Sequence, residues 1–320
     1  MLTGNDVLKI RHFVYRNARP IDLYRWQHHM ENTSAQQIYQ ALSAYQNPDG
    51  GFGHALEADA WNPHSTPIQT STAAHILWDN GLLEKNHPLV WGILQYLDSG
   101  KDMAEHRWLN IVPSNNDYPH APWWEMESVS TSHSEFNPTA ILAGAGLYFA
   151  PERSSLFVRC KKIAGELIAA FLSAPEISMH SLLCVESLMN WIKKAGLISM
   201  FPMEDLEAQV LVQENRLMQS DKDKWDGYAC RPSEFIHTPQ HPLYAQNKEL
   251  VERELDWLEE KRNADGVWEI TWSWAGYDKA FAISENWWKV DIAIRNMRYL
   301  KAFGRLQAHM HKFRGNEYDL

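Results

Sequence analysis

The chain has 320 residues and a formal net charge of −10 at pH 7, with 45% hydrophobic and 22% charged residues. This composition is typical of a soluble globular protein, and the shortage of Lys and Arg argues against a nucleic-acid-binding surface. No apolar run approaches the roughly 18 residues of a membrane span, and the first residues lack the charged and then apolar pattern of an export signal. We therefore expect a cytoplasmic protein.

Helical patterns predominate from the N-terminus onward. A capping box at Ser34 and Gln37 precedes apolar residues spaced at i, i+3, i+4 and i+7. Thr66-Pro67 and Asn137-Pro138 each place a capping side chain before a proline, which is tolerated at the first position of a helix. The Ala- and Gly-rich residues 140–148 would let two helices approach closely. Further helices are predicted over residues 6–17, 20–31, 88–98, 151–173, 178–196 and 203–219.

The C-terminal third continues this pattern. An apolar stripe over residues 251–258 indicates another helix, and the last long helix is predicted to start after Ser284 and stop at Gly304. The only strand-like alternation covers residues 267–274. The chain is therefore predicted to be all-α, with about twelve helices, and without a linker it is predicted to be a single domain over residues 1–320. Four long loops separate the helices: residues 47–65, 110–136, 220–248 and 263–284.

The same kind of turn follows two of these helices. The first copy is Gln46-Asn47-Pro48-Asp49-Gly50-Gly51-Phe52-Gly53, and the second is Arg262-Asn263-Ala264-Asp265-Gly266-Val267-Trp268. Each combines an Asp-Gly turn with an aromatic residue that can tuck back under the preceding helix. A helix-turn unit used more than once predicts a helical array closed on itself.

The first turn resembles the repeats of squalene cyclases and protein prenyltransferase β subunits. Three blocks, Ala41 to Leu77, Asn137 to Gly146 and Tyr228 to Leu306, resemble bacterial proteins described as prenyltransferase-like or terpenoid-cyclase-like. Together these blocks cover about half of the chain. The resemblance implies an α/α toroid, in which an inner ring of helices is wrapped by an outer ring around a central cavity.

The catalytic motifs of those families do not occur here. Class II terpene cyclases protonate their substrate with D-x-D-D and class I synthases hold magnesium with D-D-x-x-D, and the sequence has neither. Cys160, Cys184 and Cys230 are widely spaced, without CxxC pairing, and the surroundings of Cys230 lack the zinc pattern of protein prenyltransferases. The histidines form no recognised metal motif. We therefore expect no metal and no cofactor.

Three carboxylates are the candidate catalytic residues. Glu57 and Asp59 follow the glycine-rich turn, and in a toroid such a loop lies at the rim of the cavity, where two carboxylates can act as general acid and base. Glu285 lies near the predicted start of the last helix beside Trp287 and Trp288, and burial against tryptophan raises the pKa of a carboxylate. The structural alternatives are helix capping, hydrogen bonds from turn amides and interaction with the helix dipole.

Aromatic residues near these acids are the candidate binding residues. The chain contains 15 Trp, which either fill the core between helices or line a cavity for a ligand. Paired indoles flanked by carboxylates at residues 123–127 are typical of a ligand-facing lid. The predicted substrate-binding residues are His54, Trp61, Trp123, Trp124, Glu125, Trp274, Tyr277 and Trp288.

The sequence thus predicts an enzyme with an acid- and aromatic-lined central cavity, acting on an isoprenoid-type substrate as the resemblance implies. Aromatic faces would stabilise developing positive charge, and Glu57 or Asp59 would move the proton. Two alternatives stay open: a carbohydrate-active α/α-barrel enzyme with paired carboxylates, and a non-catalytic ligand-binding toroid. The expected partner is a small molecule, with no nucleic acid and no membrane span, and the sequence carries no signal for an oligomeric state.

Overall fold

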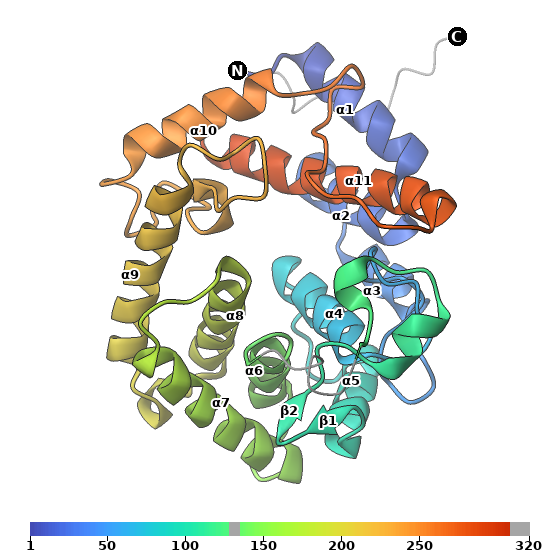
Figure 1. Cartoon of the computed structure of the whole chain (residues 1–320), viewed down its shortest axis with the longest axis vertical. Coiled ribbons are helices and arrows are strands. Elements are labelled where there is room, and N and C mark those ends of the chain that lie inside the picture. Colours follow the sequence, from blue (N-terminus) through green and yellow to red (C-terminus); the bar gives the residue numbers. More distant parts are fainter. Residues whose placement is uncertain (128–134, 308–320) are drawn as a thin grey trace. The chain divides into compact units, whose positions relative to one another are not determined.

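The computed structural model describes residues 1–127 and 135–307, so residues 128–134 of the predicted loop 110–136 lie outside the described residues. In this part of the chain the structure is mostly helical, as predicted (Figure 1). The α-helices are α1 Gly4–Asn17, α2 Pro20–Glu31, α3 Gln36–Ser43, α4 Pro67–Asp79, α5 Pro88–Ser99, α6 Thr139–Phe149, α7 Ser155–Ser173, α8 Met179–Ala195, α9 Met203–Asp221, α10 Lys248–Glu260 and α11 Asp278–Ala302. Short 3-10 helices are η1 Pro113–Asp117, η2 Pro122–Trp124, η4 Ile198–Met200 and η5 Pro232–Glu234. No helix in the described ranges is both long and apolar enough to cross a membrane.

The chain forms two compact units. Unit 1 comprises Met1–Ile38, Ser220–Trp272 and Ala282–Leu320, and unit 2 comprises Tyr39–Gln219 and Ser273–Phe281. The prediction of one domain rests on the absence of a linker in the sequence, and it stays a prediction. Most of the predicted site residues belong to unit 2.

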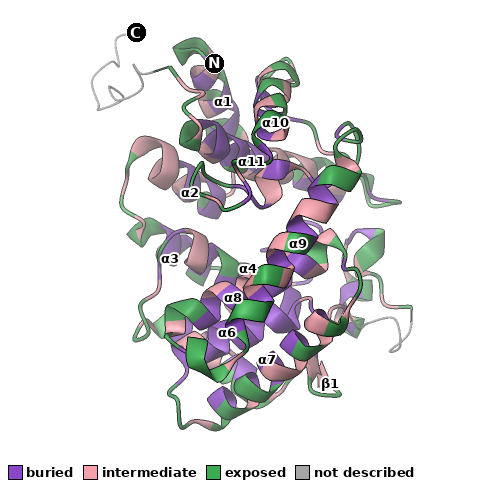
Figure 2. Cartoon of the chain, turned by 90° about the vertical axis from the view of Figure 1, so that its left-hand side faces the viewer, coloured by how far each residue is buried: buried purple, intermediate pink, exposed green. Residues whose placement is uncertain are grey.

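Small residues allow close helix packing in the core of unit 2. Nearly all of α6 is buried (Figure 2). A Cβ atom added at Gly144 would lie 2.7 Å from the Trp191 side chain on α8, and one added at Gly146 would lie 2.4 Å from Cys160 Sγ on α7. The prediction that the Ala- and Gly-rich stretch permits close approach is therefore confirmed. Trp191 is itself buried, so this tryptophan fills the core.

The predicted helix caps hold at α4 and fail at α6. Thr66 Oγ1 accepts a hydrogen bond from the Gln69 N–H at 3.1 Å, which is the geometry of an N-cap. At α6 the helix begins at Thr139, with Pro138 at the N-cap and no side-chain capping hydrogen bond. The prediction that Asn137 caps a helix starting at the proline is wrong, because the helix starts one residue later.

A small hairpin was not predicted from the sequence. The strands β1 (Met103–Ala104) and β2 (Arg107–Trp108) pair in antiparallel fashion. Their two loop residues, Glu105 and His106, have φ values of 50° and 65°, the left-handed conformation that a two-residue hairpin loop requires. Neither is the Gly, Asn or Asp that usually indicates such a loop. The alternating residues 267–274 do not form a strand.

The last helix starts earlier than predicted. α11 begins at Asp278, so Ser284 is a fully buried residue inside the helix instead of its start. The end agrees with the sequence, since the helix stops at Ala302 and Gly304 has a φ of 69°. Because Glu285 lies well inside α11, the argument that the N-terminal helix dipole favours its charge is wrong.

Candidate functional site

The first Asp-Gly turn closes on itself through backbone hydrogen bonds. The Asn47 N–H donates to the Gly51 carbonyl at 2.8 Å, and the Gly50 N–H donates to the Asn47 carbonyl at 2.9 Å. Gly50 has a φ of 88°, a conformation open to glycine. Phe52, the aromatic residue that follows, is completely buried, as the sequence predicts.

The second turn repeats this geometry in unit 1. The Asn263 N–H donates to the Val267 carbonyl at 2.8 Å, the Gly266 N–H donates to the Asn263 carbonyl at 2.9 Å, and Gly266 has a φ of 84°. The buried Trp268 donates its indole N–H to the Leu258 carbonyl of α10 at 2.9 Å, so it tucks back under the helix that precedes the turn. The predicted repetition is confirmed at the level of these turns.

Close packing accounts for the glycines of the first turn. A Cβ atom at Gly50 would lie 2.1 Å from the carbonyl oxygen of Gly92 on α5, and one at Gly51 would lie 2.6 Å from Ser65 Cβ. A Cβ atom at Gly53 would lie 2.3 Å from a backbone oxygen of the following loop. Because they lack a Cβ atom, these glycines allow the turn to pack closely against its neighbours in unit 2.

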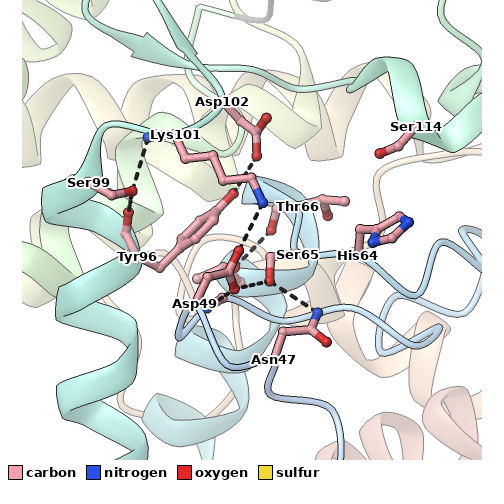
Figure 3. Close-up of polar contacts among 12 residues, drawn as sticks. Asn47, Asp49, His64, Ser65, Thr66, Tyr96, Ser99, Lys101, Asp102 and Ser114 are labelled. Carbon is pink, nitrogen blue, oxygen red and sulfur yellow. Dashed lines mark hydrogen bonds and ion pairs between the residues drawn. The ribbon is translucent and has the colours of Figure 1, made fainter.

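The carboxylate of this turn accepts three hydrogen bonds (Figure 3). Asp49 accepts from Ser65 Oγ, from the Gly51 N–H at 3.2 Å and from Lys101 Nζ at 2.9 Å. Although burial alone would raise the pKa of Asp49, these donors hold it below its ordinary value of 3.8. Asn47 adds a hydrogen bond to Ser65 Oγ at 3.1 Å. These hydrogen bonds hold the turn in place, so the Asp49 carboxylate has a structural role that requires no ligand.

His54, a predicted binding residue, contacts this turn. Its imidazole Nε2 lies 3.0 Å from Asn47 Oδ1, and the side chain is exposed. His54 and Ala55 have φ values of 61° and 60°. The contact gives the imidazole a structural role, and its predicted role in substrate binding stays a prediction.

A buried glutamine of α4 holds the loop that carries the predicted acids. Gln69 Oε1 accepts from the Leu56 N–H at 2.9 Å, and Gln69 Nε2 donates to the Asn62 carbonyl at 2.9 Å. The same carbonyl accepts from the His54 N–H at 2.9 Å. Both ends of residues 54–62 are thereby fixed to one side chain of a buried helix.

Two buried asparagines join this loop to the loop after β2. Asn62 Nδ2 donates to Asn115 Oδ1 at 2.9 Å and to Ser114 Oγ at 2.8 Å. Asn115 Nδ2 donates to the Trp124 carbonyl at 3.1 Å. Both asparagines are almost fully buried, and their hydrogen bonds set the position of the Trp124 backbone.

Asp59 lies where three loop segments of unit 2 meet. Its carbonyl accepts from the Ala121 N–H at 2.8 Å, and the neighbouring Trp61 N–H donates to the Pro119 carbonyl at 2.9 Å. Its carboxylate Oδ1 accepts from the indole Nε1 of Trp274 at 2.9 Å. The residue is 3% exposed. A nearly buried carboxylate thus accepts a hydrogen bond from a side chain more than 200 residues away in the sequence.

An aromatic cluster adjoins this position through Trp274. Trp274, Ala121 and Ala280 form a buried cluster, against which the partly buried side chains of Trp61, Trp124 and Phe281 pack. We call these six residues and Asp59 the Asp59 cluster. Of the predicted site residues, the structure brings together Asp59, Trp61, Trp124 and Trp274.

Two other predicted aromatics lie beside the cluster and face solvent. Trp123 adjoins Trp124 in η2 and is 44% exposed, and Tyr277 is 47% exposed with a φ of 54°. The Tyr277 ring lies 5.7 Å from the buried imidazole of His120. His120 was not singled out from the sequence, because a lone histidine in a loop has no motif to mark it.

The remaining predicted acids of unit 2 differ from Asp59 in their surroundings. Glu57 is half-buried, and its backbone carbonyl accepts from the Ala60 N–H at 3.1 Å. Glu125 follows η2 and is exposed. Asp59 is therefore the most buried of the three carboxylates.

Glu285 and Trp288 belong to unit 1. Glu285 Oε1 forms an ion pair with Lys289 Nζ at 2.9 Å, one helical turn further along α11, and Lys289 also pairs with Glu269 at 2.6 Å. The Trp288 ring packs edge-on against Trp272 at 5.3 Å. The ion pair gives Glu285 a structural explanation that differs from the capping and helix-dipole alternatives considered from the sequence.

Two further acids of unit 2 have raised pKa values. Burial, together with the charge of Glu186, raises the pKa of Glu214 on α9 to about 8. Burial raises the pKa of Glu186 on α8 to about 7, and the charge of Lys193 opposes the shift. Neither acid lies in a motif, so only their positions within amphipathic helices could have indicated burial.

Three members of the Asp59 cluster escaped the sequence analysis: Ala121, Ala280 and Phe281. So did Asn62 and Asn115, which hold the loops that carry it. Within the described ranges, no three His, Cys, Asp or Glu side chains gather as a metal-binding group. Comparisons of the chain with protein-family models, curated proteins and solved structures gave no match.

Proposed function

We propose that this chain is an enzyme acting on an isoprenoid-type substrate by proton transfer from a carboxylate, on the α/α toroid that its turns and sequence blocks resemble. Asp59 is the proton-transferring residue, and the aromatic side chains of the Asp59 cluster bind the apolar part of the substrate. The repeated Asp-Gly turn supports the toroid, since the same helix-turn geometry occurs in both compact units.

The observation that carries the proposal is the hydrogen bond from Trp274 Nε1 to Asp59 Oδ1. A carboxylate that is 3% exposed is sheltered from water, and a sheltered acid beside aromatic rings is suited to moving a proton to or from an apolar molecule. Indole faces stabilise the positive charge that protonation of a double bond creates. Trp61, Trp124 and Trp274 supply such rings from three different segments.

The proposal assigns different roles to the three predicted acids. Asp59 moves the proton, and the half-buried Glu57 is the candidate for the second acid-base group in the same loop. Glu285 is ion-paired with Lys289 and serves the stability of α11. Replacing each of the three acids by its amide should therefore change substrate conversion to a different extent.

Asp59→Asn tests the proposal because the amide oxygen of asparagine can still accept the indole N–H. Wild type and variants would be incubated with farnesol, farnesyl diphosphate and squalene, and products would be identified by mass spectrometry. We expect conversion to fall by at least about 100-fold in Asp59→Asn, as for loss of a general acid or base, while Glu285→Gln converts at the wild-type rate. Equal conversion by wild type and Asp59→Asn would contradict the proposal.

A carbohydrate substrate is the second candidate, favoured by the exposed rings of Trp123 and Tyr277. Flat aromatic faces open to solvent suit a sugar ring better than a buried hydrocarbon. Oligosaccharides in the same assay distinguish the two classes. Turnover of an oligosaccharide, lost in Asp59→Asn and in Tyr277→Ala, would replace the isoprenoid proposal.

A further inference from the structure

An open groove of about 440 Å³ lies between α7 and the residues at the end of η4, and it shares no residue with the Asp59 cluster. On the α7 side the lining residues follow helical spacing: Val158, Lys161, Lys162 and Gly165. The other side is formed by residues 200–202. The whole groove belongs to unit 2.

The apolar side chains at this groove are exposed to solvent. Val158 is 61% exposed and Met200 is 43% exposed. Ile198, in the same short helix as Met200, is 51% exposed. Single exposed apolar residues are common, but a group of them at a concave surface is typical of an interaction site. The groove therefore offers apolar surface that a partner would remove from water.

Gly165 lies inside α7 without the packing reason found at Gly144 and Gly146. A Cβ atom added at Gly165 would meet no other atom within 4 Å, and its φ is not in the left-handed region. A glycine inside a helix destabilises that helix relative to alanine. Nothing within the described residues requires the glycine, whereas a partner in the groove would, because the missing side chain lets its backbone approach α7 closely.

The charges that line the groove are positive. Lys161 and Lys162 are exposed, and none of the described residues that line the groove is acidic. Lys161 has no ion-pair partner in the described part of the chain. Lys162 Nζ has a long contact with Glu166, at 3.9 Å, and Glu166 is itself paired with Arg107 at 2.9 Å. In a protein with a net charge of −10, the groove is therefore a local site for an acidic group.

We infer that this groove binds a short, acidic amphipathic segment of a partner protein. Apolar side chains of the segment pack against Val158 and Met200, and its carboxylates pair with Lys161 and Lys162. Burial of the apolar surface supplies most of the affinity, while the charges select an acidic partner. The backbone of the segment comes closest to α7 at Gly165.

Other occupants fit these observations less well. A small molecule is normally enclosed over most of its surface, whereas most residues that line this groove are exposed. Anionic membranes attract clusters of about four to eight Lys or Arg, and the groove has two lysines. A second copy of the chain, docked groove to groove, would place lysines against lysines.

Peptide selection tests the class of segment. A display library of random short peptides would be selected against the full chain, and the dissociation constants of the enriched peptides would be measured by fluorescence anisotropy. We expect these peptides to combine Leu, Ile, Val or Phe with Asp or Glu, and to bind more weakly as the salt concentration rises. Enrichment of basic or uncharged peptides, or of none that bind in solution, would overturn the inference.

Three substitutions locate the binding site. Gly165→Leu fills the groove and should weaken binding by at least about ten-fold, without lowering the midpoint of urea unfolding, because the added Cβ has room and leucine favours a helix. Val158→Asp should weaken binding by a similar factor, because it places a charge at an apolar contact. Lys161→Glu should weaken binding about three- to ten-fold at low salt and less at high salt.

Matched controls carry the same changes outside the groove. Val212→Asp, at a valine of α9 that is 58% exposed, and Lys194→Glu, at an exposed lysine of α8, should leave the dissociation constants unchanged. Equal binding by wild type and Gly165→Leu would contradict the inference.

Two further measurements separate the other occupants. Cosedimentation of wild type with vesicles of phosphatidylcholine and phosphatidylserine, lost in Val158→Asp, would assign the groove to a membrane and overturn the inference. A wild-type dimer in analytical ultracentrifugation that dissociates in Val158→Asp would assign it to a second copy of the chain, with the same consequence. We expect neither result.

Discussion

Asp49 and Asp59 are ten residues apart in one loop region of unit 2 and have opposite surroundings. Asp49 accepts hydrogen bonds from Ser65, Lys101 and the Gly51 amide, and its side chain is 39% exposed. Asp59 is 3% exposed and accepts from the indole of Trp274. The first carboxylate belongs to a prominent glycine motif, whereas the second lies in an inconspicuous Ala-Asp-Ala stretch.

The difference shows that a conspicuous sequence motif, here the glycine-rich turn at Asp49, can have a purely structural role in packing. Every glycine of the Asp49 turn has a neighbouring backbone or side chain where a Cβ would lie, and its carboxylate neutralises a nearby lysine. At Asp59 the contacts come from segments that are distant in sequence, and the neighbouring side chains are aromatic. Three substitutions test this contrast.

The largest effect is expected at the turn glycine. Gly50→Ala should lower the free energy of unfolding by about 3 kcal/mol or more, because the new Cβ would clash with the Gly92 carbonyl at a positive φ. Gly81→Ala is the matched control, since Gly81 also has a positive φ but has no atom within 4 Å of the added Cβ. This control should lose about 1 kcal/mol. Equal losses in urea unfolding would show that backbone strain alone, and not packing, explains the motif.

Removal of the indole donor should have an intermediate effect. Trp274→Phe keeps most of the aromatic bulk but leaves the buried Asp59 carboxylate without this N–H, which should cost about 2 kcal/mol of unfolding free energy. Trp91→Phe, at a tryptophan of α5 that is 56% exposed, should cost less than about 0.5 kcal/mol. Chemical denaturation of both variants measures the difference, and a loss in Trp274→Phe no larger than in Trp91→Phe would contradict the role given to the hydrogen bond.

The smallest effect is expected at Asp49 and depends on pH. Its folded pKa lies below the ordinary value of 3.8, so its ionised form stabilises the fold above pH 3.8, and this contribution disappears as pH falls through the folded pKa. Because the side chain is partly exposed, Asp49→Asn should cost less than about 1 kcal/mol at pH 7. The difference between wild type and variant should vanish at low pH in urea titrations.

The equivalent aspartate of the second turn is the control for this experiment. Asp265 is 59% exposed and has a long ion pair with Arg16, at 3.7 Å. Asp265→Asn should therefore change the unfolding free energy less than Asp49→Asn at neutral pH. A wild-type advantage over Asp49→Asn that grows as the pH is lowered would contradict the proposed donors.

The helical class and most helix positions could be predicted because apolar periodicity and caps are local properties. The early start of α11 could not, since Ser284 and the residues after it mimic a capped helix start, while the true first turn carries Asp278 as its only helix-start signal. The hairpin loop at Glu105 and His106 was missed for a related reason, because it uses residues without a preference for positive φ. Local chemistry therefore predicted elements well and their boundaries less well.

The candidate site was predictable only in its outline. Asp59, Trp61, Trp124 and Trp274 could be named because acids and indoles in long loops suggest a ligand site, and the structure places them together. Their supporting residues could not be named, since the role of Asn62 depends on Asn115, which lies in another loop. Glu285 resembled a site residue until its partner Lys289 was known.

The two Asp-Gly turns share their backbone hydrogen bonds although one has Gly51 where the other has Val267. The signature common to both is therefore Asn-x-Asp-Gly-x-aromatic. Gly51, the second glycine of the first copy, is required only because Ser65 and Tyr96 leave no room for a Cβ atom there. A search for helix-turn units that insists on paired glycines would overlook the Asn263 copy, whereas one built on the asparagine, the left-handed glycine and the buried ring would find both.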